Sequence, residues 1–178
     1  MARRKSWNEK LHDAKDLPKV VQIDETSACT WGRGSCVVPA PLEVDHLMRQ
    51  VKRGRVVTSK ELRDALATAH GTDVACPIVT GIFCGIAAHA AVEAEELGEA
   101  RTTPWWRTLK AGGELNPKYP GGIERQRALL EAEGHTMIAR GKRWFVHEHE
   151  RRLANLTPKS RMAREAGSQT TVASRRTS

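Results

Sequence analysis

The chain has 178 residues, 39% of them hydrophobic and 28% charged, and a mass of 19.7 kDa, which suits one soluble globular domain with tails. The net charge of +8 favours an anionic partner, but residues 1–20 carry six Lys and Arg against three Asp and Glu, and residues 151–178 carry seven against one, so the excess lies in the tails. The longest apolar stretch, Ile82 to Val92, is too short to span a bilayer and no apolar block follows the charged N-terminus, so we expect no membrane segment, no signal peptide and a cytoplasmic protein.

Residues 1–41 are polar and interrupted, and we expect an N-terminal extension that is only partly ordered. Within it, Lys19 to Ile23 predicts a short strand and Trp31 to Gly34 a turn, while Pro39 and Pro41 end the segment. The sequence of this extension indicates no function.

Residues 42–97 carry the hydrophobic spacing of three helices. The first ends at Gly54, and the second begins at the capping box Thr58–Glu61 and ends at His70-Gly71. The third runs from about Pro77 to Leu97 and is rich in small residues. Two helices joined by a turn, the second able to approach a neighbour closely, are typical of a helix-turn-helix.

The chain from residue 102 to residue 150 predicts a mixture of short elements. We expect an extended piece over Thr102–Leu109, a glycine-rich loop to Gly122, a helix over Ile123–Glu133 and a hairpin that turns at Arg140-Gly141-Lys142. The fold class expected for residues 42–150 is therefore mainly α, with a small C-terminal β hairpin. Residues 151–178 contain almost no large apolar side chain and predict a basic, disordered tail, which is either solvated or in contact with an anion.

The four cysteines form no C-x-x-C pair and match no zinc-binding spacing; they are Cys29, Cys36, Cys76 and Cys84. In a cytosolic protein we expect them to be free thiols. The sequence predicts no metal and no cofactor.

Three motifs between residues 104 and 134 fall in a fixed order: Pro104-Trp105-Trp106-Arg107, then Tyr119-Pro120-Gly121-Gly122, then Leu129-Leu130-Glu131-Ala132-Glu133-Gly134. This stretch resembles the C-terminal domain of the O6-alkylguanine-DNA alkyltransferases, the methylated-DNA-protein-cysteine methyltransferase family. The preceding segment, from Gly54 to Gly85, is similar too, with insertions around Ala69–Pro77 and Glu93–Thr103. The resemblance covers about residues 42–135 and implies a winged helix-turn-helix fold that binds DNA.

Two substitutions separate the chain from the family's enzymes. Trp105 stands where the resemblance places the alkyl-accepting cysteine, Trp106 stands where it places the activating histidine, and only Glu133 of that relay remains. A thiolate is the nucleophile in such chemistry, and an indole nitrogen is only a hydrogen-bond donor. Cys84 is a poor substitute because the sequence places no base or cation beside it. The resemblance therefore implies no catalytic residue and no enzyme.

Loss of the cysteine to tryptophan is the mark of the alkyltransferase-like proteins, which bind O6-alkylguanine lesions and hand them to nucleotide excision repair. The chain resembles that group, although its motif usually continues with His-Arg and Trp106 departs from it. The implied partner is double-stranded DNA with an alkylated guanine, bound by a monomer with the base flipped out of the stack, and nucleotide excision repair proteins follow as a further implied partner.

The resemblance also implies the site residues. A lesion pocket would use Trp105 as an apolar wall and Tyr119 to stack on the flipped base, while glycines let backbone amides approach; it comprises Pro104, Trp105, Tyr119, Pro120, Gly121 and Gly122. Trp106 and Glu133 would be the vestigial relay. The expected DNA contacts are Lys52, Arg53, Arg55, Thr58, Ser59, Lys60, Ile82, Gly85, Arg107, Arg140, Lys142 and Arg143.

Two of these DNA contacts depart from the family's pattern. Ile82 stands near the position of the arginine that fills the hole left by a flipped base, and Ser59 stands in place of a tyrosine. Arg107 follows the motif, where the family uses it more for structure than for chemistry. An apolar wedge can still enter between base steps, so flipping by Ile82 stays an expectation.

Three other functions stay open. A winged-helix regulator of specific DNA would use Trp105 and Tyr119 only for its core, and a protein- or RNA-binding module would fit the changes at Ile82 and Ser59. An active alkyltransferase is disfavoured by the missing cysteine. Simpler roles also exist for single features: Trp105 and Trp106 as core, Glu133 as an ion-pair partner, and the cluster Lys52–Arg55 as a solvated turn.

Overall fold

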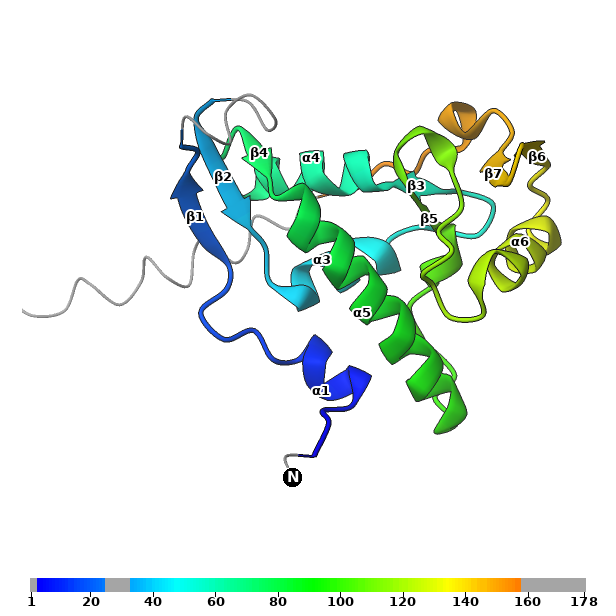
Figure 1. Ribbon diagram of the computed structural model, residues 1–178, viewed down its shortest axis with the longest axis horizontal. Coiled ribbons are helices and arrows are strands. Elements are labelled where there is room, and N and C mark those ends of the chain that lie inside the picture. The colour runs from blue at the N-terminus through cyan, green and yellow to red at the C-terminus, as the bar shows by residue number, and fades with distance from the viewer. Residues whose placement is uncertain (1–2, 25–32, 158–178) are drawn as a thin grey trace, which may run out of the picture.

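The computed structural model of the protein describes residues 3–24 and 33–157 and combines helices with small sheets (Figure 1). Its α-helices are α1 (Trp7–Leu11), α3 (Pro41–Arg49), α4 (Ser59–His70), α5 (Pro77–Glu96) and α6 (Gly122–Ala132). Its strands are β1 (Lys19–Gln22), β2 (Ser35–Val38), β3 (Val57–Thr58), β4 (Val74–Ala75), β5 (Thr108–Leu109), β6 (Met137–Arg140) and β7 (Arg143–Val146). Short 3-10 helices are η1 (Trp105–Arg107), η2 (Ala111–Gly113) and η3 (His149–Arg152).

The sheets correct the expected fold class, since the described residues form three sheets and not one hairpin. A three-stranded sheet has the order β1-β2-β4, with β1 antiparallel and β4 parallel to β2. Strands β3 and β5 pair in parallel, and β6 and β7 form the expected antiparallel hairpin. The fold is therefore mixed, with helices and several small sheets.

Helix α5 is the central element of the fold. It crosses the middle of the molecule, between the β1-β2-β4 sheet and the region of α6 and the β6–β7 hairpin (Figure 1). It contacts α1, α3, α4 and η1. By length and composition alone α5 could cross a membrane, which is weak evidence because the core helix of a soluble protein passes the same test.

Two apolar clusters hold the elements together. The larger one joins α3, α4 and α5 around side chains such as Met48, Leu62 and Cys84, and the smaller one joins β5, α6 and β7 around Leu109, Leu130 and Val146. Full burial of one such leucine is worth about 1.5–3 kcal/mol. The second cluster fixes the hairpin against α6.

Local sequence signals set the ends of α4. The Thr58 hydroxyl accepts the Lys60 N–H at 3.2 Å, the Glu61 carboxylate accepts the Thr58 N–H at 3.0 Å, and the helix ends at Gly71 with φ +62°. The predicted capping box and glycine stop are thus confirmed.

The C-terminal end of the domain differs from expectation. The predicted tail starts at residue 151, but η3 spans His149–Arg152, and the Val56 backbone accepts the Ala154 N–H at 2.8 Å and donates to the Arg152 carbonyl at 2.9 Å. Gln50 likewise exchanges two hydrogen bonds with Thr157. The packed chain therefore continues past the expected boundary. Cys29, half of the predicted turn at 31–34 and residues 158–178 lie outside the described residues.

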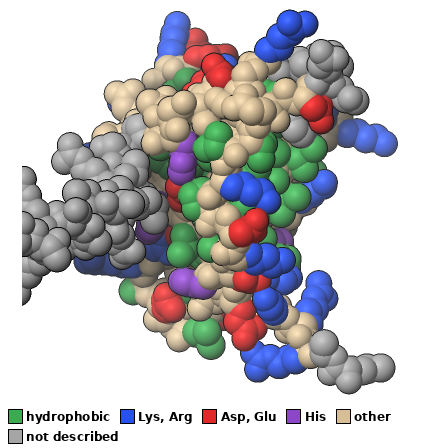
Figure 2. Space-filling view, turned by 90° about the vertical axis from the view of Figure 1, so that its left-hand side faces the viewer, with side chains coloured by type: hydrophobic (Ala, Val, Ile, Leu, Met, Phe, Trp, Pro, Cys, Tyr) green, Lys and Arg blue, Asp and Glu red, His purple; other side chains and the backbone are tan. Residues whose placement is uncertain are grey.

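Strand β1 begins and ends close to its predicted bounds, and its four residues are exposed. Val20 and Val21 are 51% and 40% exposed on this edge strand. Figure 2 shows the side of the molecule on which β1 lies: hydrophobic side chains gather in the middle of this face and Lys and Arg side chains surround them.

Candidate functional site

One face of α5 carries an apolar stripe that is turned to solvent. It follows helical spacing, and its members are Ile78, Gly81, Ile82, Gly85, Ile86 and His89. Ile78 and Ile82 are 60% and 54% exposed, whereas Cys84 and Ala87, which point away from the stripe, are buried. A Cβ atom added at Gly81 or Gly85 would meet nothing within 4 Å. Another molecule can therefore approach the backbone of α5 closely at these glycines.

This stripe is the floor of a groove of about 600 Å³. The walls come from α1 and from the loop after β5, and they add Trp7, Lys110, Asn116, Pro117 and Lys118 to the six stripe residues. None of these described lining residues is Asp or Glu. The groove thus combines an apolar floor with cationic and neutral polar walls, a combination that suits an anionic ligand with flat apolar faces.

The loop wall is held in place by one buried amide. Gln126 of α6 is fully buried; its carbonyl accepts the Asn116 N–H at 2.8 Å, and its NH₂ group donates to the Trp106 and Thr108 carbonyls, each at 3.1 Å. One side chain therefore fixes the groove wall, η1 and β5 relative to α6.

We expect Gln126→Met to lower the free energy of unfolding by about 2–3 kcal/mol, because methionine keeps the volume but leaves buried backbone groups unpaired. Urea unfolding followed by circular dichroism measures this loss. Arg127→Ala is the matched control on α6, since its ion pair with Glu131 is partly exposed, and it should change stability by less than about 0.5 kcal/mol. Equal losses for the two variants would contradict the role given to Gln126.

The predicted lesion pocket is closed in this structure. Trp105 is 0% and Tyr119 is 4% exposed, and their rings meet edge to face with centroids 5.7 Å apart. Both belong to the larger core cluster, and Pro120 is buried as well. Trp106 is half-buried, so Trp105, which was expected to form a pocket wall, is the more deeply buried of the two and belongs to the core. Pro104 and Gly122 are half-buried and Gly121 is exposed.

The indole nitrogen of Trp105 is buried and has no hydrogen-bond partner among the described residues. On one side, the Trp105 ring meets the Trp106 ring edge to face at 6.0 Å. Tyr119 connects this cluster to the groove, because its hydroxyl pairs with Asn116 of the wall and with Cys84 on the buried side of α5. The expected pocket residues therefore lie behind the groove and do not line it.

The chemistry of Cys84 follows from this burial. Removal from water raises the pKa of the Cys84 thiol to about 12, and a hydrogen bond with Tyr119 only partly offsets the effect. Burial also raises the pKa of Tyr119 well above its usual value. The thiol is therefore protonated at neutral pH, which is the opposite of an activated nucleophile. In residues 3–24 and 33–157, no group of three His, Cys, Asp or Glu side chains could hold a metal ion.

The two residues of the expected relay form a buried polar network with Arg107. Glu133 accepts the Trp106 indole N–H at 2.9 Å, the Arg107 guanidinium at 2.7 Å and the Gly54 N–H at 3.1 Å. Burial raises the pKa of Glu133, but the hydrogen bonds from Arg107, Trp106 and Gly54 outweigh it and hold the pKa below its usual value. Glu133 is thus an ionised acceptor that joins α6 to η1.

Arg107 is fully engaged in this network, which corrects its placement among the DNA contacts. Its guanidinium also donates to the Val51 carbonyl at 2.6 Å, and its side chain is only 14% exposed. Loss of either partner would leave a buried charge unpaired. Arg107 therefore acts as a structural cation.

Several other expected DNA contacts are also occupied within the protein. Arg53 donates to the Ala132 carbonyl at 3.3 Å, Arg55 donates to the Arg151 carbonyl at 3.4 Å, and Lys60 pairs with Asp64 at 2.6 Å. The Thr58 hydroxyl is buried in the cap of α4, so it is a poor phosphate donor. Lys52 is exposed and Ser59 is half-buried. Of the twelve expected contacts, only Ile82 and Gly85 line the groove.

The tip of the β6–β7 hairpin carries Arg140, Lys142 and Arg143, as expected. Arg143 forms an ion pair with Glu114, and Lys110 of the groove wall pairs with the same carboxylate at 2.9 Å. Hydrogen bonds from Arg143, and then from Lys110, lower the pKa of Glu114 to about 2. This carboxylate therefore ties the hairpin to the groove wall.

The low pKa of Glu114 predicts that acid weakens this connection between the hairpin and the groove wall. Its folded pKa lies below its unfolded value near 4.5, so its stabilising contribution is complete above pH 4.5 and is lost as the pH falls toward 2. We expect Glu114→Gln to be less stable than the natural protein at pH 7, and the difference to shrink steadily between pH 4.5 and 2.5. Thermal unfolding across this range measures it. A difference that stays constant with pH would show that the ion pair does not form.

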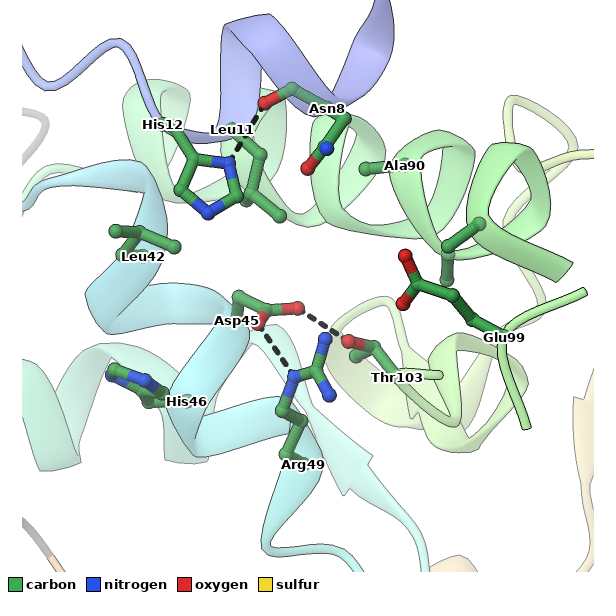
Figure 3. Close-up of a pocket in the computed structure, with 12 residues that line it drawn as sticks. Asn8, Leu11, His12, Leu42, Asp45, His46, Arg49, Ala90, Glu99 and Thr103 are labelled. Carbon is green, nitrogen blue, oxygen red and sulfur yellow. Dashed lines mark hydrogen bonds and ion pairs between the residues drawn. The ribbon is translucent and has the colours of Figure 1, made fainter. Parts of the chain in front are cut away.

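A second cavity, of about 440 Å³, lies between α1, α3 and α5 (Figure 3). Inside it, Asp45 of α3 accepts the Thr103 hydroxyl at 2.5 Å and the Arg49 Nε–H at 2.7 Å. Figure 3 shows these two bonds meeting at the Asp45 carboxylate. They fix the start of the Pro104–Arg107 segment to α3, so we assign them a structural role.

The sequence reasoning missed nine of the groove's lining residues: Trp7, Ile78, Gly81, Ile86, His89, Lys110, Asn116, Pro117 and Lys118. For Ile78 and Ile86 the signal was present, because they continue the spacing of Ile82. For Trp7, Lys110 and Lys118, which come from distant segments, the sequence carried no signal that joins them to α5.

Comparison with known proteins gives structural neighbours only. No protein-family model matches the chain, and no curated protein matches it in sequence. The structural neighbours are crystal structures of S. pombe Atl1 in complex with damaged DNA containing O6-carboxymethylguanine (17% identity, TM-score 0.45) and of S. pombe ATL in complex with DNA (18% identity, TM-score 0.48). Each match covers 65% of this chain and 94% of the other. At this level of similarity, the function has to be argued from the chain's own residues.

Proposed function

We propose that this protein binds double-stranded DNA that contains an alkylated guanine, without catalysing a reaction on it, and that the groove on α5 is the interface. The observation that carries the proposal is the exposed apolar stripe of α5, whose charged neighbours in the groove are all cationic. An amphipathic groove of this kind offers apolar contact to bases and lysine contact to phosphates.

The elements around the groove fit a winged helix-turn-helix. In this proposal α4 and α5 are the paired helices, α5 enters a DNA groove, and the β6–β7 hairpin is the wing that contacts the backbone through Arg140 and Lys142. Gly81 and Gly85 let α5 approach the DNA closely, and Ile82 is placed to enter between base steps. The volume of the groove lies within the usual range of about 300–1,000 Å³ for ligand sites, which is ample for one flipped base.

The chemistry of the core supports binding without transfer. Trp105 is no nucleophile and the Cys84 thiol is buried and protonated, so neither can accept an alkyl group. The motif resemblance further suggests that the protein acts as a monomer and passes the lesion to nucleotide excision repair proteins. In this proposal the flipped base enters the groove between α5 and the Asn116–Lys118 wall, and not the closed aromatic cluster at Trp105.

One observation favours a second candidate function. A winged-helix regulator needs Trp105 and Tyr119 only as core residues, and both are buried. Such a regulator would use the same groove on an undamaged site of specific sequence.

The test compares two duplexes of identical sequence, one of which contains a single O6-methylguanine, in titrations at the same physiological salt concentration. Binding to the lesion duplex at least about tenfold tighter, which is about 1.4 kcal/mol, supports the proposal. Equal binding excludes lesion recognition, and a footprint on one undamaged sequence would then support the regulator.

A further inference from the structure

Helix α1 is fixed firmly to α5. The Ser6 hydroxyl accepts the Glu9 N–H at 3.1 Å and Glu9 accepts the Ser6 N–H at 2.7 Å, which caps the helix. Glu93 of α5 accepts the backbone N–H groups of Trp7 and Asn8 at 3.3 and 2.7 Å. Leu11 is buried against the core. Figure 3 shows α1 beside α5, so this N-terminal helix packs on the domain.

This attachment brings Trp7 to the end of the groove. The Trp7 ring stacks on His89, with centroids 4.4 Å apart and planes 17° from parallel, and both residues line the groove. The Lys10 ammonium lies 3.9 Å from the centre of the Trp7 ring. Lys10 therefore covers part of the Trp7 ring in the unbound protein. The Nε2 atom of His89 in turn lies 3.4 Å from the carbonyl oxygen of Lys118 in the loop wall.

We infer that Trp7, backed by His89, is an aromatic end wall of the groove on which a base of the bound DNA stacks, and that Lys10 moves from the ring to a neighbouring phosphate when the base arrives. This inference rests on the proposed function, because it names the residues that hold the DNA in the α5 groove. It also gives the N-terminal segment, whose sequence indicates no function, a place in the interface.

The energetics favour this exchange. Stacking of a base on an aromatic side chain is stronger than a solvent-exposed cation–π contact, so a base can displace the flexible Lys10 side chain. The released ammonium can pair with a DNA phosphate, so its charge is not left without a partner in the complex. The stack with His89 holds the Trp7 ring in place before DNA binds, which lowers the entropy cost of association.

The occupant follows from the chemistry of the groove. An apolar peptide would fit the isoleucines but would offer no anion to the cationic wall, where Lys118 lies beside Lys110 and the Glu114 carboxylate is already shared between Lys110 and Arg143. Nucleic acid satisfies both kinds of surface, since its bases are flat and apolar on their faces and its backbone is anionic. A base that has left the duplex stack has a free face for Trp7.

The test uses the full chain with three variants and the two duplexes described above. Trp7→Leu keeps an apolar side chain against α5 but removes the aromatic face, and we expect it to bind the tighter duplex about tenfold more weakly (about 1.4 kcal/mol). Trp7→Phe keeps a ring, and we expect binding within about threefold of the natural protein. Lys10→Ala should reduce the slope of log K against log salt by about one.

Two controls separate this role from a merely structural one. Lys5→Ala removes a cation of the same segment that pairs with Asp13 and does not line the groove, and its salt slope should be unchanged. Tryptophan fluorescence gives a second readout, since stacking quenches Trp7: DNA should quench the natural protein more than Trp7→Phe, in which the other tryptophans remain.

The inference would be overturned if Trp7→Leu bound DNA with the affinity of the natural protein, or if Trp7→Leu and Trp7→Phe weakened binding equally. It would also be overturned if DNA quenched the fluorescence of the natural protein and of Trp7→Phe to the same extent. Equal binding of the natural protein to both duplexes would count against lesion recognition alone, because the Trp7 variants would still show whether the Trp7 ring contributes to DNA binding. The two failures are therefore distinguishable.

Discussion

Trp105→Ala is expected to destabilise the fold by about 3–5 kcal/mol, the usual cost when a buried aromatic side chain is truncated. The reason is the position of the ring, which is fully buried in the core cluster between Trp106 and Tyr119. Because domains of this size are stable by only about 5–15 kcal/mol, this loss should shift the urea midpoint substantially. Urea unfolding followed by circular dichroism measures it.

Two further variants, Trp105→Phe and Trp106→Phe, separate the loss of buried ring volume from the loss of a hydrogen bond. Trp105→Phe keeps most of the buried ring and removes an indole N–H that has no described partner, so we expect a smaller loss than for alanine. Trp106→Phe removes a hydrogen bond to Glu133 and tests the polar network instead. If Trp105→Ala folded with unchanged stability and lost affinity only for the lesion duplex, Trp105 would be a pocket wall that bound bases reach.

The different burial of Trp105 and Trp106 could not be predicted from the sequence. The Pro-Trp-Trp-Arg stretch was expected to be extended, in which case the two side chains would point to opposite sides. It forms the 3-10 helix η1, where neighbouring side chains are about 120° apart, so both tryptophans turn toward protein. Trp105 enters the core and Trp106 meets Glu133. The expectation of a pocket came from the resemblance, which fixes the position in the chain but not the burial.

Elements defined by neighbouring residues were predictable. The capping box at Thr58–Glu61 and the hairpin around Gly141 depend on short stretches of sequence, and both are present. The β2–β4 pairing was missed because it joins Cys36 and Val37 to Val74 and Ala75, two-residue matches far apart in the chain. A pairing so short leaves no periodic signal in either segment.

The groove was missed for a different reason. Helix α5 is apolar on nearly every side, which predicts a helix buried all round. Its small residues, among them Ala87 and Ala88, fill the close contact with the neighbouring helices, and the larger Ile78 and Ile82 are left in solvent. Spacing reveals such a stripe, but only the packing of α1, α3 and α4 decides which side of α5 stays open.

The second large effect is therefore expected on DNA binding, from a substitution at Ile82. We expect Ile82→Glu to weaken DNA binding by more than about tenfold, or about 1.4 kcal/mol, because it places an anion on the floor of a groove with cationic walls that would receive phosphates. Its folding stability should change by less than about 0.5 kcal/mol, since the side chain is 54% exposed. Fluorescence anisotropy with a labelled duplex measures the affinity.

Leu97→Glu is the matched control for this experiment. It makes the same change of charge just beyond the end of α5, where Leu97 is 78% exposed and does not line the groove, so net-charge effects are equal in the two variants. We expect it to change affinity by less than about threefold. Ile82→Arg adds a cation at the same position and should tighten binding, because it supplies both an intercalating side chain and a phosphate partner. If both glutamate variants weakened binding equally, the α5 groove would not be the interface, and the DNA would have to contact another cationic surface such as the β6–β7 hairpin.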